Sequence, residues 1–418
     1  MSVATILGRV DRCVSAWTNG KSPDRLAIAL LAVFTAAWTV YGTLSKANQD
    51  VHHDTGELVS WSREGAGAHH PAMAAWIAGA WFRLFPLEDW AAYLLAMTNV
   101  AVALWIAWLV FREWLDPVKS LAALGMLCLI PLHTFQALKY NANTVMLPFW
   151  AATIYFFLKS YLTRSPVHAA LAGAAGAGAL LGKYWSVFLI AGLAAAALID
   201  RRRSSYWRSA APYISVAFGL ALVTPHVASV VSGSSDSMRF VSESVRQAWT
   251  IDTSLSKSFK YLLGALGYAS PAILILFLLR PSGAALKDIV RPMDEDRRLV
   301  AAIFWVPLLL PALLNLFVPT RLSSVWTIPN WLLLPLVLLQ SPKLSVTRKG
   351  AVRIVAGQAW YLARNLVYVL GRIEIAFEAD RRRALDTAAP YVTSGHQQVR
   401  SVALALLKRL ASQGLGPE

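Results

Sequence analysis

The chain has 418 residues, of which 56% are hydrophobic and only 15% are charged, and its formal net charge is +16. A soluble protein needs more surface charge than this composition provides, so a soluble globular class is excluded. Continuous apolar runs of about 18 residues or more recur along the chain, and each is long enough to cross a bilayer. The runs lack the strict alternation of an outer-membrane β-barrel. We therefore expect an all-α, polytopic helical membrane protein with about ten transmembrane helices.

The positive charge does not indicate a nucleic-acid partner. The basic residues fall between the apolar runs, where cytoplasmic loops carry them, and no RNA-binding pattern is present. The two cysteines, Cys13 and Cys128, are far apart, which argues against a disulfide framework or a cysteine-based zinc site. The first apolar run has no small-residue cleavage pattern, so we interpret it as a retained span. The partner that the composition indicates is the lipid bilayer.

Basic residues before the first apolar run, Arg9, Arg12, Lys21 and Arg25, place the N-terminal segment in the cytoplasm. The first span then covers about 26–44, and the polar stretch 51–71 is an extracytoplasmic loop. An aromatic segment at 71–86 is expected to lie in the membrane interface. Nine further spans follow. The second and third cover about 90–111 and 120–132, the fourth returns to Lys159, the fifth runs from Val167 to "GKYW", and the sixth ends at "DRRRSSYWR". The seventh runs from Ala210 to "TPHVASV", the eighth ends at Arg280, the ninth reaches "VPTR", and the tenth covers about 324–340.

The chain divides by composition into a membrane domain, 1–340, and a basic C-terminal tail, 341–418. The tail sequence "WYLARNLVYVLGRIEIAFEADRRR" places apolar and charged residues at helical spacing, which favours a surface helix over a span. We expect this amphipathic helix to lie on the anionic cytoplasmic face of the membrane.

The predicted topology brings unusual polar residues from five segments to the extracytoplasmic face. Ionisable residues at membrane depth are costly and usually functional, so this one-sided sorting predicts an extracytoplasmic active site. The residues are Asp54, Glu57, His69, His70, Asn141, Asn143, Lys183, Tyr184, His226 and Arg321.

Each of these features also has a purely structural interpretation. The histidine pairs are either solvated loop residues or ligands, although their spacing matches no closed zinc motif such as HExxH. Lys183 is either functional or a lysine that reaches from a helix end to the interface. The preceding "GAAGAGALLGK" is not a phosphate loop, because its glycines miss the GxxxxGK spacing and Tyr184 replaces the Ser or Thr. Asn141 and Asn143 are also candidate helix caps.

Four features in this order resemble the GT-C superfamily of membrane glycosyltransferases: an acidic stretch after the first span, "HHP" before an aromatic helix, "YNANTVMLPFWA", and "LLGKYW". The branch that looks most similar contains bacterial enzymes related to protein O-mannosyltransferases and the lipid A aminoarabinose transferase. The likeness covers about 26–340. Two positions depart from the pattern, because Ala72 stands where a second proline is common and Asn143 where several relatives have an aspartate.

The resemblance implies an inverting glycosyltransferase that moves a sugar from a polyprenyl phosphate to an extracytoplasmic acceptor, which is a glycolipid, an envelope polysaccharide or a protein. It also implies a bacterial cytoplasmic (inner) membrane location. The acid of the first loop matches Asp54, which we expect to be the general base, with Glu57 in support. Lys183 and Arg321, together with Tyr184, are expected to bind the donor phosphate.

The other polar residues have open roles. His69, His70 and His226 either donate hydrogen bonds to phosphate or hold a divalent metal ion, and Asn141 and Asn143 contact the acceptor or the donor. The alternative functions are a membrane transporter and another lipid-linked transferase. A transporter is less consistent with this sequence, because internal repeats are absent and the ionisable residues gather at one surface instead of the midplane.

The predicted topology has a direct test. We expect single cysteines placed near Gly65 and Ser235 to react with impermeant thiol reagents in intact cells, whereas a cysteine near Arg202 should not react. Labelling near Arg202 in sealed cells would contradict the predicted sidedness and the extracytoplasmic site with it.

Overall fold

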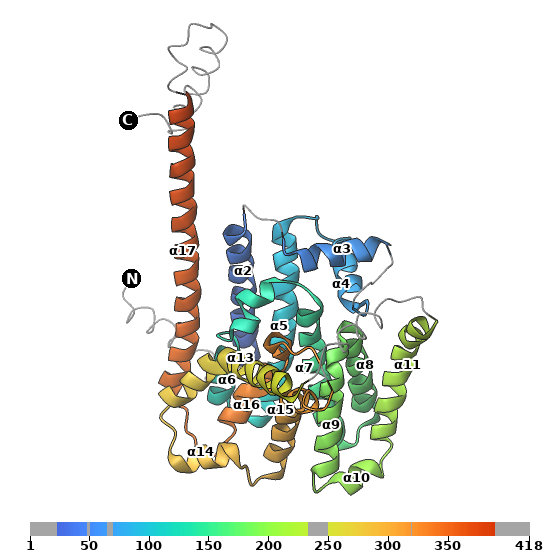
Figure 1. Cartoon of the computed structure of the whole chain (residues 1–418). Coiled ribbons are helices and arrows are strands. Elements are labelled where there is room, and N and C mark those ends of the chain that lie inside the picture. Colours follow the sequence, from blue (N-terminus) through green and yellow to red (C-terminus); the bar gives the residue numbers. More distant parts are fainter. Residues whose placement is uncertain (1–22, 48–50, 65–69, 233–249, 319, 389–418) are drawn as a thin grey trace, which may run out of the picture. The chain divides into compact units, whose positions relative to one another are not determined.

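The computed structural model describes residues 23–47, 51–64, 70–232, 250–318 and 320–388, and every regular element in these ranges is helical (Figure 1). The chain forms two compact units, residues 1–360 and 361–418. Helix α17 (Arg348–Ala388) contributes to both units. It contains the predicted tail helix, whose position at the membrane surface stays a prediction. His69, the two labelling positions Gly65 and Ser235, and the end of the tail lie outside the described residues.

Six described helices are long and apolar enough to cross a membrane: α2 (Pro23–Ser45), α5 (Asp89–Trp114), α7 (Ala142–Thr163), α11 (Ala211–Val231), α13 (Ile251–Leu278) and α15 (Glu295–Leu314). A broken pair, Pro117–Leu127 (α6) and Pro131–Leu138, bends by 76° and makes a seventh if it counts as one span. Three shorter apolar segments complete the set: α8 (Pro166–Gly182), η3 with α9 (Tyr184–Ile199), and η5 with α16 (Asn330–Leu339). Each predicted span therefore contains helix, but the number ten is not confirmed.

The predicted histidine-rich loop is largely a helix, α3 (His53–Glu64), followed by α4 (Met73–Trp81). Asp54 lies in the first turn of α3, where a negative charge complements the helix dipole. Leu58 and Thr55 are buried, so α3 has an inner face that the polar sequence did not reveal. Helix α4 buries Ala74 and Ala78 while Trp76 is exposed, as expected of an interfacial helix.

Small residues allow the central helices to pack closely. Helix α7 packs against α5 and α8, and α11 packs against α8. A Cβ atom on Gly173 of α8 would lie 2.1 Å from the carbonyl oxygen of Ser215 on α11, so no side chain fits there. A Cβ atom on Gly178 would lie 2.4 Å from the Phe149 ring of α7. Glycine is thus used at these crossings for close approach, as in other membrane helices.

The histidine-rich segment and the basic loops lie at opposite ends of the first unit. Helices α3 and α4 are at one end, and α10 (Arg203–Trp207) and α14 (Gly283–Val290) are at the other (Figure 1). At the α10 end, Arg202 forms an ion pair with Asp200 at 2.9 Å and a second one with Asp296. This separation is what the predicted topology requires.

A buried histidine stabilises the break after α6. The Nδ1 atom of His133 lies 3.1 Å from the Leu127 carbonyl oxygen, and its Nε2 atom lies 3.2 Å from the Ile328 carbonyl oxygen. A broken helix exposes backbone carbonyls that need a donor in an apolar environment, and the imidazole lies against two of them. His133 therefore has a structural role, and the break leads the chain towards Tyr140 and the start of α7.

Candidate functional site

Asn141 caps α7 and at the same time contacts Asp54. Its Oδ1 atom accepts hydrogen bonds from the backbone N–H groups of Asn143 (2.9 Å) and Thr144 (3.2 Å). Thr144 Oγ1 accepts in turn from the Asn141 N–H at 3.0 Å, which completes a capping box. Because Oδ1 serves the cap, Nδ2 is the atom that faces outward, and it donates to Asp54 Oδ2 at 2.9 Å. Asn141 therefore is a helix cap and also binds the Asp54 carboxylate, whereas its contact with the acceptor or the donor stays a prediction.

Tyr140, the residue before this cap, connects α3 and α4 to α7. Its backbone carbonyl accepts a hydrogen bond from Thr55 Oγ1 at 3.0 Å, and its buried hydroxyl donates to the Ala74 carbonyl at 3.3 Å. Burial raises the pKa of the Tyr140 hydroxyl, so the group remains a neutral donor. Thr55 directly follows Asp54 in the chain. These bonds therefore fix the position of Asp54 relative to the first turn of α7.

Two histidines lie on the other side of the Asp54 carboxylate. The Oδ1 atom of Asp54 is 2.9 Å from His53 Nε2 and 3.5 Å from His52 Nδ1. Burial lowers the pKa of His52, and Lys139 and Lys46 lower it further, while Asp54 raises it. The Asp54 side chain is still 34% exposed, so a substrate can reach it. Glu57 is exposed on α3, three residues after Asp54.

Lys183 lies between α8 and η3, outside both apolar helices, and is buried with only 8% exposure. Its Nζ atom donates to Asn143 Oδ1 at 2.5 Å and lies 4.1 Å from the centre of the Trp326 ring, a cation–π distance. Burial and the nearby Arg321 lower the pKa of Lys183 to about 7, against the opposing influence of Asp54. An interfacial snorkelling lysine would expose its ammonium group to water, which Lys183 does not do.

Tyr184, His226 and Arg321 are connected to the Lys183 turn. The Tyr184 hydroxyl and His226 Nε2 are 2.7 Å apart, which links the turn after α8 to α11. Trp185 and Trp326 pack edge to face with ring centroids 4.9 Å apart. Trp326 follows the exposed Arg321 by five residues, so this contact brings the segment after α15 to the Lys183 turn. His70 is half-buried.

One group of described residues has the composition of a metal site. The donor atoms of His52, His53 and Asp54 all lie within 4.8 Å of one another. Imidazole and carboxylate are common ligands for zinc and other divalent ions, so the donor set fits such an ion. The surroundings are less favourable, because Lys46 and Lys139 act on the same histidine. Positive charge at this point opposes a cation and favours an anion.

Several residues of the site were not among the predicted ones. His52 and His53 belong to the stretch that drew attention, but their contact with Asp54 depends on the start of α3. Lys139 stands two residues before Asn141, which was the only signal for it in the sequence. Tyr140 and Trp326 look like ordinary aromatic residues of a membrane protein, and only the fold shows their contacts.

Comparisons with known proteins agree with this fold. A family model described as dolichyl-phosphate-mannose-protein mannosyltransferase matches residues 69–228, a range that includes Asn141, Asn143 and Lys183. Two crystal structures of ArnT from Cupriavidus metallidurans have a similar fold at 14% sequence identity, over 93% of this chain and 72% of theirs. The TM-score is 0.58 for ArnT bound to undecaprenyl phosphate and 0.57 for the apo state. No curated protein matches the chain.

These findings confirm the resemblance that the sequence motifs indicated. The chain is a polytopic helical membrane protein with a fold similar to that of ArnT, and its residues 69–228 match the mannosyltransferase family model. The likeness to ArnT establishes the fold, and the family match includes Asn141, Asn143 and Lys183 but neither Asp54 nor Arg321.

Asn141→Asp separates the two roles of Asn141. Aspartate caps helices about as well as asparagine, so α7 should keep its thermal stability. The new carboxylate cannot donate to Asp54 and repels it, so we expect lower activity and an acidic limb of the pH–rate profile shifted to higher pH. Asn141→Ala, the control, should lose about 1 kcal/mol of stability from the missing cap. An unchanged pH–rate profile in Asn141→Asp would show that the amide does not orient Asp54.

Proposed function

We propose that the protein transfers a sugar from a polyprenyl phosphate to a hydroxyl-bearing acceptor outside the cytoplasm, with inversion at the anomeric carbon. The observation that carries this proposal is the first turn of α7. There, Asn141 holds a carboxylate, Asp54, and Asn143 holds a buried cation, Lys183. A transfer from a phosphate needs both groups, a base for the acceptor and a cation for the leaving group.

Asp54 is the proposed general base. The acceptor oxygen attacks the anomeric carbon and its proton passes to Asp54, which is exposed enough to contact it. Asn141 and the two histidines hold the carboxylate from opposite sides, which leaves little rotational freedom to lose in the transition state. Glu57, on the same helix and exposed, is the proposed supporting acid.

Lys183 and Arg321 are the proposed phosphate-binding residues. As the bond between the anomeric carbon and the phosphate oxygen breaks, the polyprenyl phosphate leaves with an additional negative charge. Lys183 is a compact donor fixed by Asn143 and Trp326, and Arg321 is a nearby guanidinium suited to bidentate binding. Two cations this close repel each other until an anion lies between them, so the site favours a phosphate.

Attack from the face opposite the departing phosphate inverts the anomeric centre, and one base on the acceptor side suffices for it. The lipid phosphate is a suitable donor outside the cytoplasm, where nucleotide sugars are scarce. We place the protein in a bacterial cytoplasmic membrane with this site at the extracytoplasmic face, and the acceptor is a glycolipid, an envelope polysaccharide or a protein. Profiling the glycolipids and polysaccharides of a deletion strain by mass spectrometry tests the proposal, and an unchanged profile would oppose it.

The proposed site also contains a set of side chains whose donor atoms fit a divalent ion. His52, His53 and Asp54 would hold it, and it would supply a positive charge beside the donor phosphate. Basic side chains already provide such charge, because Lys46 and Lys139 act on His52, and Lys183 interacts with both Asp54 and Arg321. We therefore assign the histidines the role of orienting Asp54.

Asp54→Asn should remove the proton acceptor while keeping the size of the side chain. General acid–base catalysis contributes a factor of about 10² to 10⁴, so turnover should fall by this factor at normal protein abundance and normal donor binding. Glu57→Gln, the matched control on the same helix, should reduce turnover far less. Turnover close to wild type in Asp54→Asn would exclude Asp54 as the base.

Lys183→Gln should raise the KM for the polyprenyl-phosphate sugar and lower kcat, because charge-assisted hydrogen bonds are about twice as strong as neutral ones. Lys183→Arg keeps the charge in a wider shape and should be intermediate. In the wild type, KM should also rise above pH 7, because a lysine with a pKa of about 7 loses its charge there. Lys183→Arg should lack this rise. Unchanged kinetics of Lys183→Gln at matched expression would make Arg321 the phosphate-binding residue.

Removal of divalent ions should leave most of the activity, because the basic side chains supply the charge beside the phosphate. The measurement is turnover of the purified enzyme after chelation, with elemental analysis to verify that the metal is gone, followed by addition of single ions. Loss of activity that one ion restores would assign His52, His53 and Asp54 to a metal site.

A further inference from the structure

Lys183 is held by two neutral partners, the amide of Asn143 and the indole ring of Trp326. Its Nζ atom donates to Asn143 Oδ1 at 2.5 Å and lies 4.1 Å from the centre of the Trp326 ring. Neither partner carries a net charge. A buried ammonium is usually paired with a carboxylate, which neutralises it in a salt bridge. The arrangement around Lys183 instead stabilises the ammonium while its charge stays available for an anion.

The segment that carries Trp326 is held in place by two other parts of the fold. Trp326 lies in the short helix η4 (Ser324–Thr327). A Cβ atom on Gly264 of α13 would lie 2.6 Å from Ser324 Oγ, so α13 and η4 are in close contact. Directly after η4, the carbonyl oxygen of Ile328 lies 3.2 Å from the Nε2 atom of the buried His133. The backbone that positions the Trp326 ring is therefore fixed on both sides of that residue.

A second tryptophan limits the orientation of the Trp326 ring. Trp185 packs against it edge to face, with ring centroids 4.9 Å apart and an angle of 67° between the ring planes. Trp185 is buried and packs in turn on Phe188 and Tyr261, at centroid distances of 4.7 Å and 6.2 Å. Because Trp185 follows Lys183 by two residues, one short turn supplies both the ammonium and the ring that orients its aromatic partner.

We propose that Trp326 is a positioning residue for the donor phosphate, because its indole face holds Lys183 in place as an ammonium without neutralising it. The inference rests on the proposed function, which puts the phosphate of the donor at Lys183. An aromatic face attracts a cation through its quadrupole, and this attraction is strongest in a desolvated site. A carboxylate in the same place would bring a full negative charge, which would repel the phosphate.

The retained charge matters most for the leaving group. The donor is a phosphodiester with a single negative charge, whereas the departing polyprenyl phosphate is a monoester whose charge approaches −2 near neutral pH, at about −1.5 to −2. Lys183 and Arg321 are close enough to act on each other. Their combined charge matches the leaving phosphate better than the bound donor, so it lowers the barrier in addition to strengthening binding.

The charge of Lys183 depends on the groups that face it. Asp54 of α3 stabilises the ammonium, whereas burial and Arg321, from the segment after α15, destabilise it. The hydrogen-bonded pair of Tyr184 and His226 begins one residue further along the turn. Trp326 attracts only the charged form, so a weaker cation–π contact lowers the pKa of Lys183. An anion that needs the ammonium should then lose affinity at a lower pH than in the wild type.

Fluorinated tryptophans test this role without changing the packing. Each fluorine atom withdraws electron density from the ring face and leaves the shape of the ring nearly unchanged, so a series incorporated only at position 326 weakens the cation–π contact in steps. The probe is the methyl diester of a polyprenyl phosphate, which does not titrate near neutral pH and has no sugar to transfer. Its Kd is measured against pH with the full chain in nanodiscs. We expect the pH at which Kd rises to fall along the series, by about 0.5 to 1.5 in total.

Two matched controls assign the effect. Trp331 lies five residues after Trp326, packs on Phe304 and donates to Thr327 Oγ1 at 3.0 Å, so the same fluorinated residues at position 331 should leave the pH dependence unchanged. In a Lys183→Arg background the cation does not titrate in this range, so fluorination at position 326 should no longer move the pH at which Kd rises. A shift that persists in this background would belong to another group and would overturn the proposal.

The outcomes also separate this inference from the proposed function. Wild-type protein that binds the diester, together with fluorinated proteins that bind it identically at every pH, would overturn the role of Trp326 and leave the function intact. An equal shift from fluorination at position 331 would do the same. Wild-type protein that does not bind the diester at any pH would contradict the proposed donor phosphate at Lys183, and this inference with it.

Discussion

The first turn of α7 is the constraint on which the geometry of the site depends. A helix start leaves backbone N–H groups without partners, and the Asn141 side-chain oxygen accepts hydrogen bonds from two of them. This use of the oxygen leaves the amide nitrogen for Asp54. Two residues further on, Asn143 binds Lys183. Because both asparagines belong to one helical turn, backbone geometry fixes the carboxylate and the ammonium relative to each other, which is the preorganisation that charge stabilisation requires.

The electrostatics of this turn are balanced only in part. A buried ammonium is costly unless hydrogen bonds and opposite charge compensate it. Asn143, the face of Trp326 and the charge of Asp54 compensate Lys183, while Arg321 opposes it. Lys46 and Lys139 add further positive charge near His52. The site therefore has an excess of positive charge, which a bound phosphate would neutralise. Ligand binding and site stability are thus expected to be coupled.

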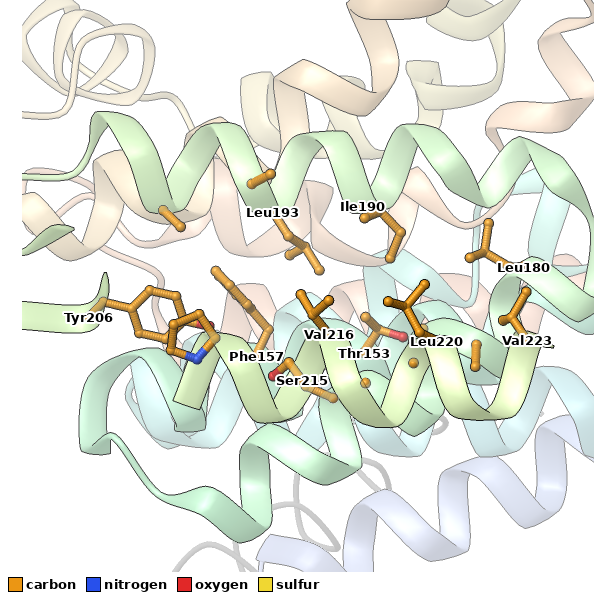
Figure 2. A pocket seen from close by; sticks show the side chains of 18 of the residues that line it. Thr153, Phe157, Leu180, Ile190, Leu193, Tyr206, Ser215, Val216, Leu220 and Val223 are labelled. Atoms are coloured by element: carbon orange, nitrogen blue, oxygen red, sulfur yellow. The ribbon is translucent and has the colours of Figure 1, made fainter. Parts of the chain in front are cut away.

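The short helices around the site also help to position its charged groups. Helix α8 stops at Gly182, so the chain turns within the protein and carries Lys183 into a buried position instead of into lipid. The small residues that let α8 approach α11 also leave an apolar space beside α9 that encloses about 280 Å³ (Figure 2). The packing of one glycine- and alanine-rich helix therefore shapes both the Lys183 turn and this space.

The sequence by itself determined the class of the protein and the residue types of the site. Hydrophobic length and charge distribution are local properties, so the segments that became α2, α5, α7, α11, α13 and α15 could be located from them. Polar residues that are costly in a membrane could also be recognised one by one, as Asp54, Asn141, Asn143 and Lys183 were.

Only the tertiary structure decided which of these residues meet. Asn141 and Asp54 are 87 residues apart in the chain and Lys183 and Asn143 are 40 apart, so no local pattern encodes their contacts. The helical start of α3, which brings two further histidines to Asp54, depends on tertiary burial of Leu58 and Thr55 within a polar sequence. The number of full-length spans was also undecided, because a break such as that after α6 is stable only where a distant partner, here through His133, satisfies the freed backbone.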